Sequence, residues 1–384
     1  LTIWDTTQGV FVVQQMVAGA LKLPLANVRV IGHYMGGGFG SKLEAGKYTV
    51  IAALLAKRTA RPVKLFLTRE EVFLNAGNRP ANTMKVKIGA KKDGALTAIE
   101  FSSIGSGGAY PNGADTSFLA TDLYTCPNVA AVDENVAINA GRARAMRAPG
   151  FPQGAWALEQ AMDELALKLG MDPVALRLAN VPKVSQRRGN LPYTSTGLAE
   201  CLSGGAKAFG WETTRAAKKD DGPIRKGDGV AAGMWGYGGG PPATVVVKLF
   251  ADGSVNVNAG AADIGTGTKT VMAQTVAEEL GVPLEKIQIE HADTGTTQYS
   301  GPSGGSKTVP SDMPAARAAA VEVRTKLLAG AAEELKVSAA ELKLEGAEVV
   351  STKDPAKKLA VTAVPALQRD QVLVGVGTRG PNVE

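Results

Sequence analysis

Cysteine and histidine are scarce in this sequence. Its 384 residues include two cysteines, Cys126 and Cys201, and two histidines, His33 and His291. Two distant cysteines form neither a C-x-x-C pair nor an iron–sulfur ligand set, and they exclude a disulfide framework. One histidine per half of the chain does not make a metal site, so we expect both to be structural and the protein to supply no metal ligand.

Long apolar runs and long runs of one charge are also missing. No stretch approaches the roughly 18 apolar residues that span a bilayer, so no membrane span is predicted. The net charge of +6 comes from 42 basic and 36 acidic residues that are interspersed, which argues against nucleic-acid binding. The chain begins with Leu1 rather than Met, so the choice between cytoplasm and periplasm stays open.

Glycine, in contrast, is abundant and gathers in discrete loops. Three of the 46 glycines precede Phe39 in the segment Met35-Gly36-Gly37-Gly38-Phe39-Gly40-Ser41-Lys42. Such a run lets the backbone adopt positive φ and turn its N–H groups toward a ligand. The segment is therefore a candidate anion cradle; an ordinary glycine-rich turn is the alternative.

A distant internal repeat accompanies this loop. Residues 15–30 and 274–289 share Gln, Val, Ala, Leu, Pro and Leu at matching positions. Each copy predicts a helix, a proline-marked turn and a short strand, followed by a Gly/Ser-rich loop that contains a lysine. Solenoid repeats have periods of roughly 20–50 residues, so two copies this far apart indicate two related lobes that face one site.

The remaining pattern predicts an α+β fold of two mixed lobes. We expect helices at 11–21, 154–168 and 315–336, a buried helix at 45–58, a strand at 61–67, and hairpins with Asp-Gly turns at 84–101 and 245–258. A charged segment with Gly and Pro, 213–229, is the predicted linker between a lobe at 1–212 and a lobe at 230–384, which ends without a closing signal.

A second anion-binding candidate precedes the helix at 154–168. The basic, Pro/Gly-rich segment 142–153 leads directly into the N-terminus of that helix. Free N–H groups and the helix dipole would add to the charge of its arginines. A surface loop with solvated arginines explains the same residues.

Five loops together carry a family resemblance. They are Thr7-Gln8, 36–42, 145–153, 263–268 and 301–306, in that order along the chain. In these loops the chain resembles the molybdopterin-binding large subunit of the xanthine dehydrogenase and aldehyde oxidase family of molybdenum hydroxylases, in particular the bacterial aldehyde and isoquinoline oxidoreductases. The resemblance implies the molybdenum-cofactor-binding fold of that family, with the cofactor between two lobes.

The resemblance also implies the cofactors and partners. Molybdenum would be held by the dithiolene of a pyranopterin, in the cytosine dinucleotide form usual in bacterial members. Electrons would leave to 2Fe–2S clusters on an iron–sulfur partner subunit, and then to FAD on a further subunit or to a cytochrome.

Individual residues receive roles from the same resemblance. Gln8, near the apical oxo group, and Arg147, beside the metal, would be the catalytic residues, and Leu43 and Phe151 would line the substrate pocket. Family members often carry Gln where this chain has Thr266. The expected cofactor contacts are Gly37, Gly38, Phe39, Gly40, Arg147, Gly265, Thr266, Gly267, Thr268, Ser303, Gly304, Gly305 and Ser306.

The implied reaction is hydroxylation of a small-molecule substrate with oxygen drawn from water. The family's glutamate base has no match here, because Glu384 stands in a different context, and the family's N-terminal domain is also missing. Another chain carrying both parts would make this one a cofactor-binding scaffold that is inactive alone. Cropping of a longer chain is the other explanation.

Two departures bear on the substrate. Purine-oxidising members have a glutamate where this chain has Leu43, and they use an arginine upstream of the segment that begins at Cys126, whereas 112–126 contains no arginine. An aldehyde or an aromatic N-heterocycle is therefore expected. A phosphate-binding NTPase using 304–308 is disfavoured, because a P-loop has Gly before its Lys and Ser306 stands there instead.

Overall fold

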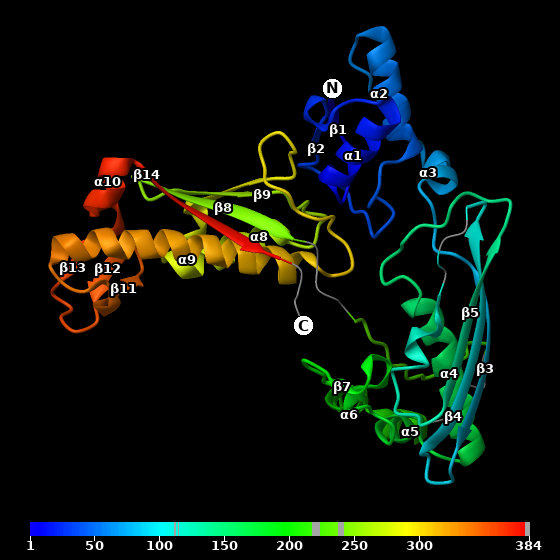
Figure 1. Cartoon of the computed structure of the whole chain (residues 1–384). Helices are drawn as coiled ribbons and strands as arrows, with labels where there is room; N and C mark the ends of the chain where they lie inside the picture. Colours follow the sequence, from blue (N-terminus) through cyan, green and yellow to red (C-terminus); the bar gives the residue numbers. More distant parts are fainter. Residues whose placement is uncertain (111–112, 114, 217–222, 237–241, 381–384) are drawn as a thin grey trace. The chain divides into compact units, whose positions relative to one another are not determined.

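The computed structural model describes residues 1–110, 113, 115–216, 223–236 and 242–380. The chain divides into two compact units, one formed by Leu1–Ala76 with Tyr237–Glu384 and the other by Gly77–Gly236 (Figure 1). Each unit combines helices with largely antiparallel sheets, and the α+β class is confirmed.

The two units differ from the lobes expected from the sequence. Both copies of the repeat belong to the first unit, and the second unit is a continuous insertion between them. Of the predicted linker, 217–222 lies outside the described residues, and 213–216 belongs to a short helix. Glu384 also lies outside the described residues.

The first unit contains most of the strands and the longest helix. Its elements are β1 (Thr2–Trp4), α1 (Val10–Leu21), β2 (Arg29–Ile31), α2 (Lys47–Thr59), α3 (Arg69–Asn75), β8 (Ala243–Phe250), β9 (Val255–Ala259), α8 (Thr268–Leu280), β10 (Ile287–His291), α9 (Thr308–Leu335), β11 (Leu342–Glu345), β12 (Glu348–Ser351), β13 (Lys358–Ala360), α10 (Pro365–Asp370) and β14 (Val372–Arg379). In the described part of the chain, no helix has the length and apolarity needed to cross a bilayer.

Each copy of the repeat forms a parallel βαβ unit. In the first copy β1 pairs in parallel with β2 across α1, and in the second β9 pairs in parallel with β10 across α8. Helix α1 buries Val10, Val13, Val17 and Leu21, which recur on one face at helical spacing. The predicted helix, turn and strand of the repeat are confirmed in both copies, and a 3-10 turn follows the proline in each.

The second copy is built into a larger sheet. Its strands belong to a mixed sheet in the order β10-β9-β8-β14, in which β8 pairs antiparallel with both β9 and β14. The predicted hairpin at 245–258 forms β8 and β9. Helix α9 runs along this sheet (Figure 1). A Cβ at Gly377 would lie 1.9 Å from the carbonyl oxygen of Ala315, so only glycine allows the strand to approach the helix this closely.

The two copies meet where β2 and β10 end. Gly32 N donates to Ala292 O at 2.8 Å, and Thr294 N donates to Val30 O at 3.0 Å. The Arg29 guanidinium pairs with both carboxylate oxygens of Asp293, at 2.8 and 2.5 Å, and this hydrogen bonding lowers the pKa of Asp293. The two copies of the repeat therefore contact each other directly within the first unit.

Two local predictions for the first unit are wrong. The helix at 45–58 forms as α2, but it buries only Thr49 and Ala53 and exposes Ile51, Leu54 and Leu55, so it is not a core helix. The segment 61–67 contains no strand in the described structure. Apolar composition led to both predictions. It does not determine whether a helix face finds a surface to pack on or whether a segment finds a strand to pair with.

The second unit packs helices against a three-stranded sheet. Its elements are β3 (Asn82–Ala90), β4 (Leu96–Gly108), β5 (Val129–Ala137), α4 (Phe151–Leu169), α5 (Pro173–Leu178), β6 (Val184–Ser185), β7 (Leu191–Pro192), α6 (Leu198–Phe209) and α7 (Trp211–Ala216). The predicted hairpin is confirmed: β3 and β4 pair antiparallel, with Gly94 at φ +90° in the turn between them. Strand β5 joins β4 in parallel, and α4 covers β3.

Candidate functional site

The glycine-rich loop after β2 is held in a left-handed conformation. Gly37, Phe39 and Gly40 have φ values of +87°, +54° and +108°. Phe39 is a bulky residue in a region that favours glycine, and its side chain is 57% exposed. Strain of this kind costs about 1–3 kcal/mol and is concentrated at functional sites.

Gln8 holds this loop in place through both its side-chain amide and its backbone. Its Oε1 accepts hydrogen bonds from Gly40 N at 2.8 Å and Lys42 N at 3.3 Å, and its Nε2 donates to Ser303 O at 2.6 Å. Its backbone N donates to Lys42 O, and its backbone O accepts from Ser303 N, both at 2.8 Å. Gln8 is 1% exposed, so it connects the loops of the two copies from inside the protein.

The same region leaves no room for side chains at two glycines. A Cβ at Gly38 would lie 2.4 Å from Gln8 Oε1, and a Cβ at Gly304 would lie 2.7 Å from Leu43 Cδ2. The loops 36–43 and 301–307 therefore lie in direct contact, joined by Gln8 and by Leu43. Ser306 repeats the left-handed geometry of Phe39, with φ +59°.

The loop before α8 is the third part of the site. Asp263 shapes it by accepting hydrogen bonds from Gly265 N at 2.9 Å and Lys269 N at 3.2 Å. Ser303 Oγ donates to Ala262 O at 2.6 Å, which ties this loop to the loop at 301–307. Gly265 and Gly267 have φ values of +93° and +82°, and no atom lies within 4 Å of a Cβ built on either.

Backbone amides without partners recur in all three loops. They are the N–H groups of Gly37, Gly38, Phe39, Thr266, Gly267, Thr268, Gly304, Gly305 and Ser306, none of which donates to another described residue. Clustered backbone N–H groups and a helix N-terminus bind anions. The residues present therefore fit a phosphorylated ligand such as a pterin nucleotide.

Two lysines adjoin these loops and share one type of environment. Burial lowers the pKa of Lys42, and the nearby carboxyl of Asp5 partly offsets the effect. Burial likewise lowers the pKa of Lys307, whose Nζ has no hydrogen-bond partner in the described structure, while Asp312 acts in the opposite direction. Both ammonium groups are close to a carboxyl group that stabilises their charge.

The remaining predicted site residues belong to the second unit. Arg147 is exposed in the loop before α4, and Phe151 is the first residue of α4. Arg79, which sequence reasoning missed, holds this loop by donating to Arg147 O at 2.8 Å and Gln153 Oε1 at 3.1 Å. Its position before Pro80 gave no signal, because the contact joins segments far apart in the sequence.

The structure thus brings together the predicted residues of the first unit. Gln8 and Leu43 join the glycine loop to Ser303 and Gly304, and Ser303 joins them to the loop before Thr268. The roles of Arg147 and Phe151 at the same site stay predictions. Among the described residues, no group of three or more His, Cys, Asp or Glu side chains is placed to hold a metal ion.

Comparison with protein families identifies the kind of domain that contains these loops. Two models, both described as a molybdopterin cofactor-binding domain, match residues 1–181 and 205–378. The chain belongs to the molybdenum hydroxylase family. The two domain models overlap the two copies of the repeat, which supports assigning the glycine-rich loops of both copies to a molybdopterin cofactor.

Curated members of this family extend well beyond the present chain. The chain is 37% identical over 328 residues to the molybdenum-binding subunit PaoC of an aldehyde oxidoreductase from Escherichia coli O157:H7, covering 84% of this chain and 44% of PaoC. It is 34% identical over 373 residues to the putative xanthine dehydrogenase molybdenum-binding subunit XdhA of Escherichia coli K12, covering 94% and 50%. The chain therefore spans about half the length of these relatives.

Solved structures of molybdenum hydroxylases share the fold. Aldehyde oxidoreductase from Desulfovibrio gigas aligns with a TM-score of 0.82 at 27% identity, covering 98% of this chain and 40% of that chain. Quinoline 2-oxidoreductase from Pseudomonas putida 86 aligns with a TM-score of 0.87 at 24% identity, covering 99% and 53%. At that identity the second match shows the fold alone.

Proposed function

We propose that this chain is the molybdenum-cofactor-binding part of an oxidoreductase that oxidises an aldehyde or an aromatic N-heterocycle with oxygen from water. The observation that supports it most is the set of unpartnered amides in three loops joined through Gln8 and Ser303. The molybdenum cofactor, when bound, would supply the redox chemistry of the oxidation.

The polypeptide has a positioning role in this proposal. Gly37, Gly38 and Phe39 would bind the cofactor on one side, and the amides of 266–268 and 304–306 would bind it on the other. Gln8 would fix the distance between the two sides, because its hydrogen bonds join the loops. Arg147 would add a charge-assisted hydrogen bond to the cofactor from the second unit.

The cytosine dinucleotide form of the cofactor and the partner subunits belong to the same proposal. An iron–sulfur subunit with 2Fe–2S clusters would take the electrons, and an FAD subunit or a cytochrome would receive them next. Cys126 and Cys201 are too few to bind a cluster, so the proposal places the clusters outside these 384 residues.

The aldehyde or N-heterocycle preference rests on Leu43. This apolar side chain touches Gly304 at the meeting of the two loops, where a carboxylate would instead favour a polar purine ring. The relative PaoC is named for an aldehyde oxidoreductase, and it is among the more similar curated proteins.

The proposal is tested by elemental and pterin analysis of the purified, folded complex. We expect close to one molybdenum and one pterin for each copy of this chain. Molybdenum far below that ratio in fully folded protein would count against the assignment. Turnover of aromatic aldehydes well above turnover of hypoxanthine is expected, and the reverse order would contradict the role of Leu43.

A cofactor-binding scaffold that is inactive alone is the second candidate. It assigns the family's glutamate, which has no match in these 384 residues, to another chain. If this candidate is right, the loaded chain binds the cofactor fully but oxidises aldehydes only after a chain carrying the glutamate segment is added. Activity of the loaded chain with its iron–sulfur partner alone would exclude it.

A further inference from the structure

The loop before α4 has a conformation that its own residues do not favour. Ala148 has φ +56°, a region in which a β-carbon is strained, and Gly150 has φ +80°. A Cβ at Gly150 would lie 2.0 Å from the carbonyl oxygen of Asp115, so only glycine fits there. Contacts from outside the loop must therefore maintain this conformation.

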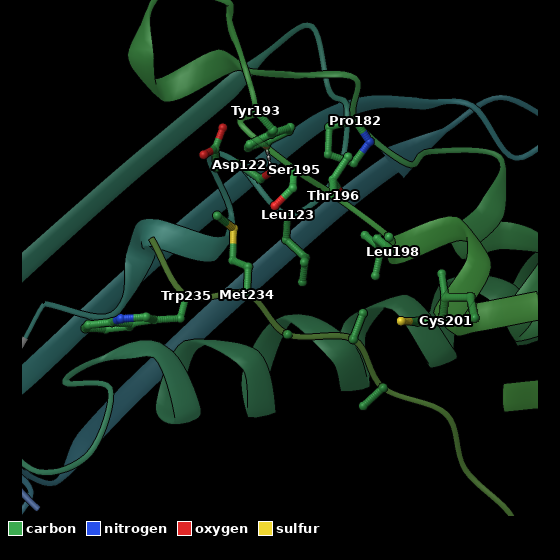
Figure 2. A pocket seen from close by; sticks show the side chains of 15 residues that line it. Asp122, Leu123, Pro182, Tyr193, Ser195, Thr196, Leu198, Cys201, Met234 and Trp235 are labelled. Atoms are coloured by element: carbon green, nitrogen blue, oxygen red, sulfur yellow. Dashed lines mark hydrogen bonds between the residues drawn. The ribbon is translucent and has the colours of Figure 1, made fainter. Parts of the chain in front are cut away.

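One side of the loop packs on aromatic rings. Phe151 stacks on Phe118 with 5.4 Å between the ring centroids, and it meets Trp235 edge-on at 4.9 Å. Trp235 also lines a cavity of about 440 Å³ in the same unit (Figure 2). These ring contacts hold the end of the loop at Phe151, beyond Arg147 and Ala148.

The guanidinium of Arg79 holds the remainder of the loop. Its Nη2 donates to Arg147 O at 2.8 Å, and its Nη1 donates to Gln153 Oε1 at 3.1 Å and to Ala148 O at 3.5 Å. Arg79 directly precedes Pro80, which favours an extended backbone at Arg79. One planar, rigid group therefore connects both ends of the loop to the segment before β3.

The same segment makes further hydrogen bonds to the loop. Gln153 Nε2 donates to Pro80 O at 3.2 Å and to Asn82 Oδ1 at 3.3 Å. Arg144 N donates to Asn78 O at 3.0 Å. Residues 78–82 and the loop are thus joined at several points, with Arg79 contacting the part that contains the strained residue.

The charge of Arg79 has no acidic partner among the described residues. Its acceptors are carbonyl and amide oxygens, and burial lowers the pKa of its guanidinium. Such an arginine could act through the geometry of its donors or through a positive charge directed at an anion. Both terminal nitrogens already donate to the loop, which favours the geometric role.

We propose that Arg79 is a positioning residue that presents Arg147 to the cofactor. It would act through the backbone of Arg147 and would not touch the cofactor itself. Because Arg147 is exposed, the direction of its side chain depends on how its backbone is held. The inference rests on the proposed function, in which Arg147 contributes a hydrogen bond to the cofactor.

Amide hydrogen exchange of the 384-residue chain without cofactor tests whether Arg79 holds the loop. Arg79→Lys keeps the charge but loses the planar fork, and Arg79→Gln loses both. Exchange at Phe151 N, which donates to Ala148 O, should become about tenfold faster in each variant. Arg188→Lys, at an exposed arginine of the same unit, is the matched control and should leave this rate unchanged.

Gln153→Ala tests the same contact from the loop. It removes the Oε1 acceptor of Arg79 and should also speed exchange at Phe151 N. Thermal unfolding of each variant would establish that it is folded. Wild-type exchange in folded Arg79→Gln and Gln153→Ala would overturn the inference, and wild-type exchange in Arg79→Lys alone would overturn the geometric role in favour of charge.

Pterin content at limiting cofactor tests whether Arg79 acts through Arg147. Arg79→Lys should lower this content about threefold or more, because a misdirected Arg147 loses its hydrogen bond. In the Arg147→Ala background, Arg79→Lys should change the content by less than about twofold, since the contact that it supports is already gone. A purely structural role would give independent losses that add in the double variant.

The outcomes separate this inference from the proposed function. Faster exchange, together with a pterin loss that disappears in the Arg147→Ala background, supports the positioning role. Additive losses, or full pterin retention in Arg79→Lys, would overturn the inference and leave the proposed function intact. Full retention in Arg147→Ala would remove Arg147 from the proposed site and overturn the inference with it.

Discussion

The two copies of the repeat share one local fold but have different support. The second copy is part of a four-stranded sheet backed by α9, with Val257, Met272 and Val276 in a large core. The first copy has only the two-stranded sheet β1–β2 and a smaller core around Val13 and Val17. Similar sequences therefore give the same βαβ unit, while the surroundings decide how firmly each unit is held.

This difference indicates that the two copies have different roles. The first copy carries the strained glycine loop, and the well-supported second copy anchors it through Ser303 and Asp293. Strain at Phe39 is tolerable because Gln8 binds the loop at two amides. In the proposed site the first copy would supply the more specialised cofactor contacts, and the second would supply the rigidity that they require.

The largest expected effect comes from Gly38→Val in the first copy. Its Cβ would meet Gln8 Oε1 at 2.4 Å, and its branches would fill the space beside the free amides. Cofactor occupancy should fall about tenfold or more, which corresponds to roughly 1.4 kcal/mol. Gly36→Val is the matched control, because no atom lies within 4 Å of its Cβ, and equal occupancy in both variants would refute the cradle.

The next effect tests the connection between the copies. Gln8→Ala leaves Ser303 O without its side-chain donor and two loop amides without an acceptor. The free energy of unfolding should drop by about 2–3 kcal/mol in urea titrations. Gln15→Ala, at an exposed position of α1, should change it little, and a similar loss in both variants would deny Gln8 a special role.

Arg147→Ala tests whether the second unit contributes to the same ligand. Loss of one charge-assisted hydrogen bond costs about 1.5–3 kcal/mol, so pterin content at limiting cofactor should drop roughly tenfold or more if the pairing is direct. Arg188→Ala removes another exposed arginine of the second unit and should retain the cofactor. Full pterin retention in Arg147→Ala would restrict the site to the first unit.

The ion pair between the copies predicts a pH dependence. Arg29 lowers the pKa of Asp293 below its ordinary value of 3.8, so the stability it contributes is present above pH 3.8 and is lost as pH falls through the lowered pKa. Asp293→Asn should therefore be less stable than the wild type at neutral pH, with a gap that narrows in acid. Asp93→Asn, in an exposed turn, should show no such convergence.

The smallest effect on cofactor content is expected at Leu43. Leu43→Ala removes apolar bulk beside Gly304 without taking a hydrogen bond from the loop amides. Occupancy should stay the same, while kcat/KM for bulky relative to small aldehydes should rise by about tenfold. Unchanged relative kcat/KM across several aldehydes would remove Leu43 from the substrate pocket.

Local features of the fold were predictable, but long-range ones were not. The spacing of Val13 and Val17 and the Asp-Gly turns report local geometry, so the repeat helix and both hairpins were predicted correctly. The exposure of α2 and the missing strand at 61–67 depend on which surfaces find partners, and composition does not encode that.

The same limit applies to the candidate site. Glycine runs located the loops, because positive φ at Gly37 and Gly40 is a local requirement. The hydrogen bonds by which Gln8 reaches Ser303, and Arg79 reaches Arg147, span distant parts of the sequence and required coordinates. The sequence therefore pointed to the candidate segments, and the structure added the residues that hold them in place.

Amide hydrogen exchange with and without bound cofactor tests most directly whether the two copies form one cradle. Loading should slow exchange together at 37–39 in the first copy and at 304–306 in the second, since the unpartnered N–H groups of both loops would bind the same ligand. Slowing in one loop alone, or in neither, at full occupancy would contradict the shared site.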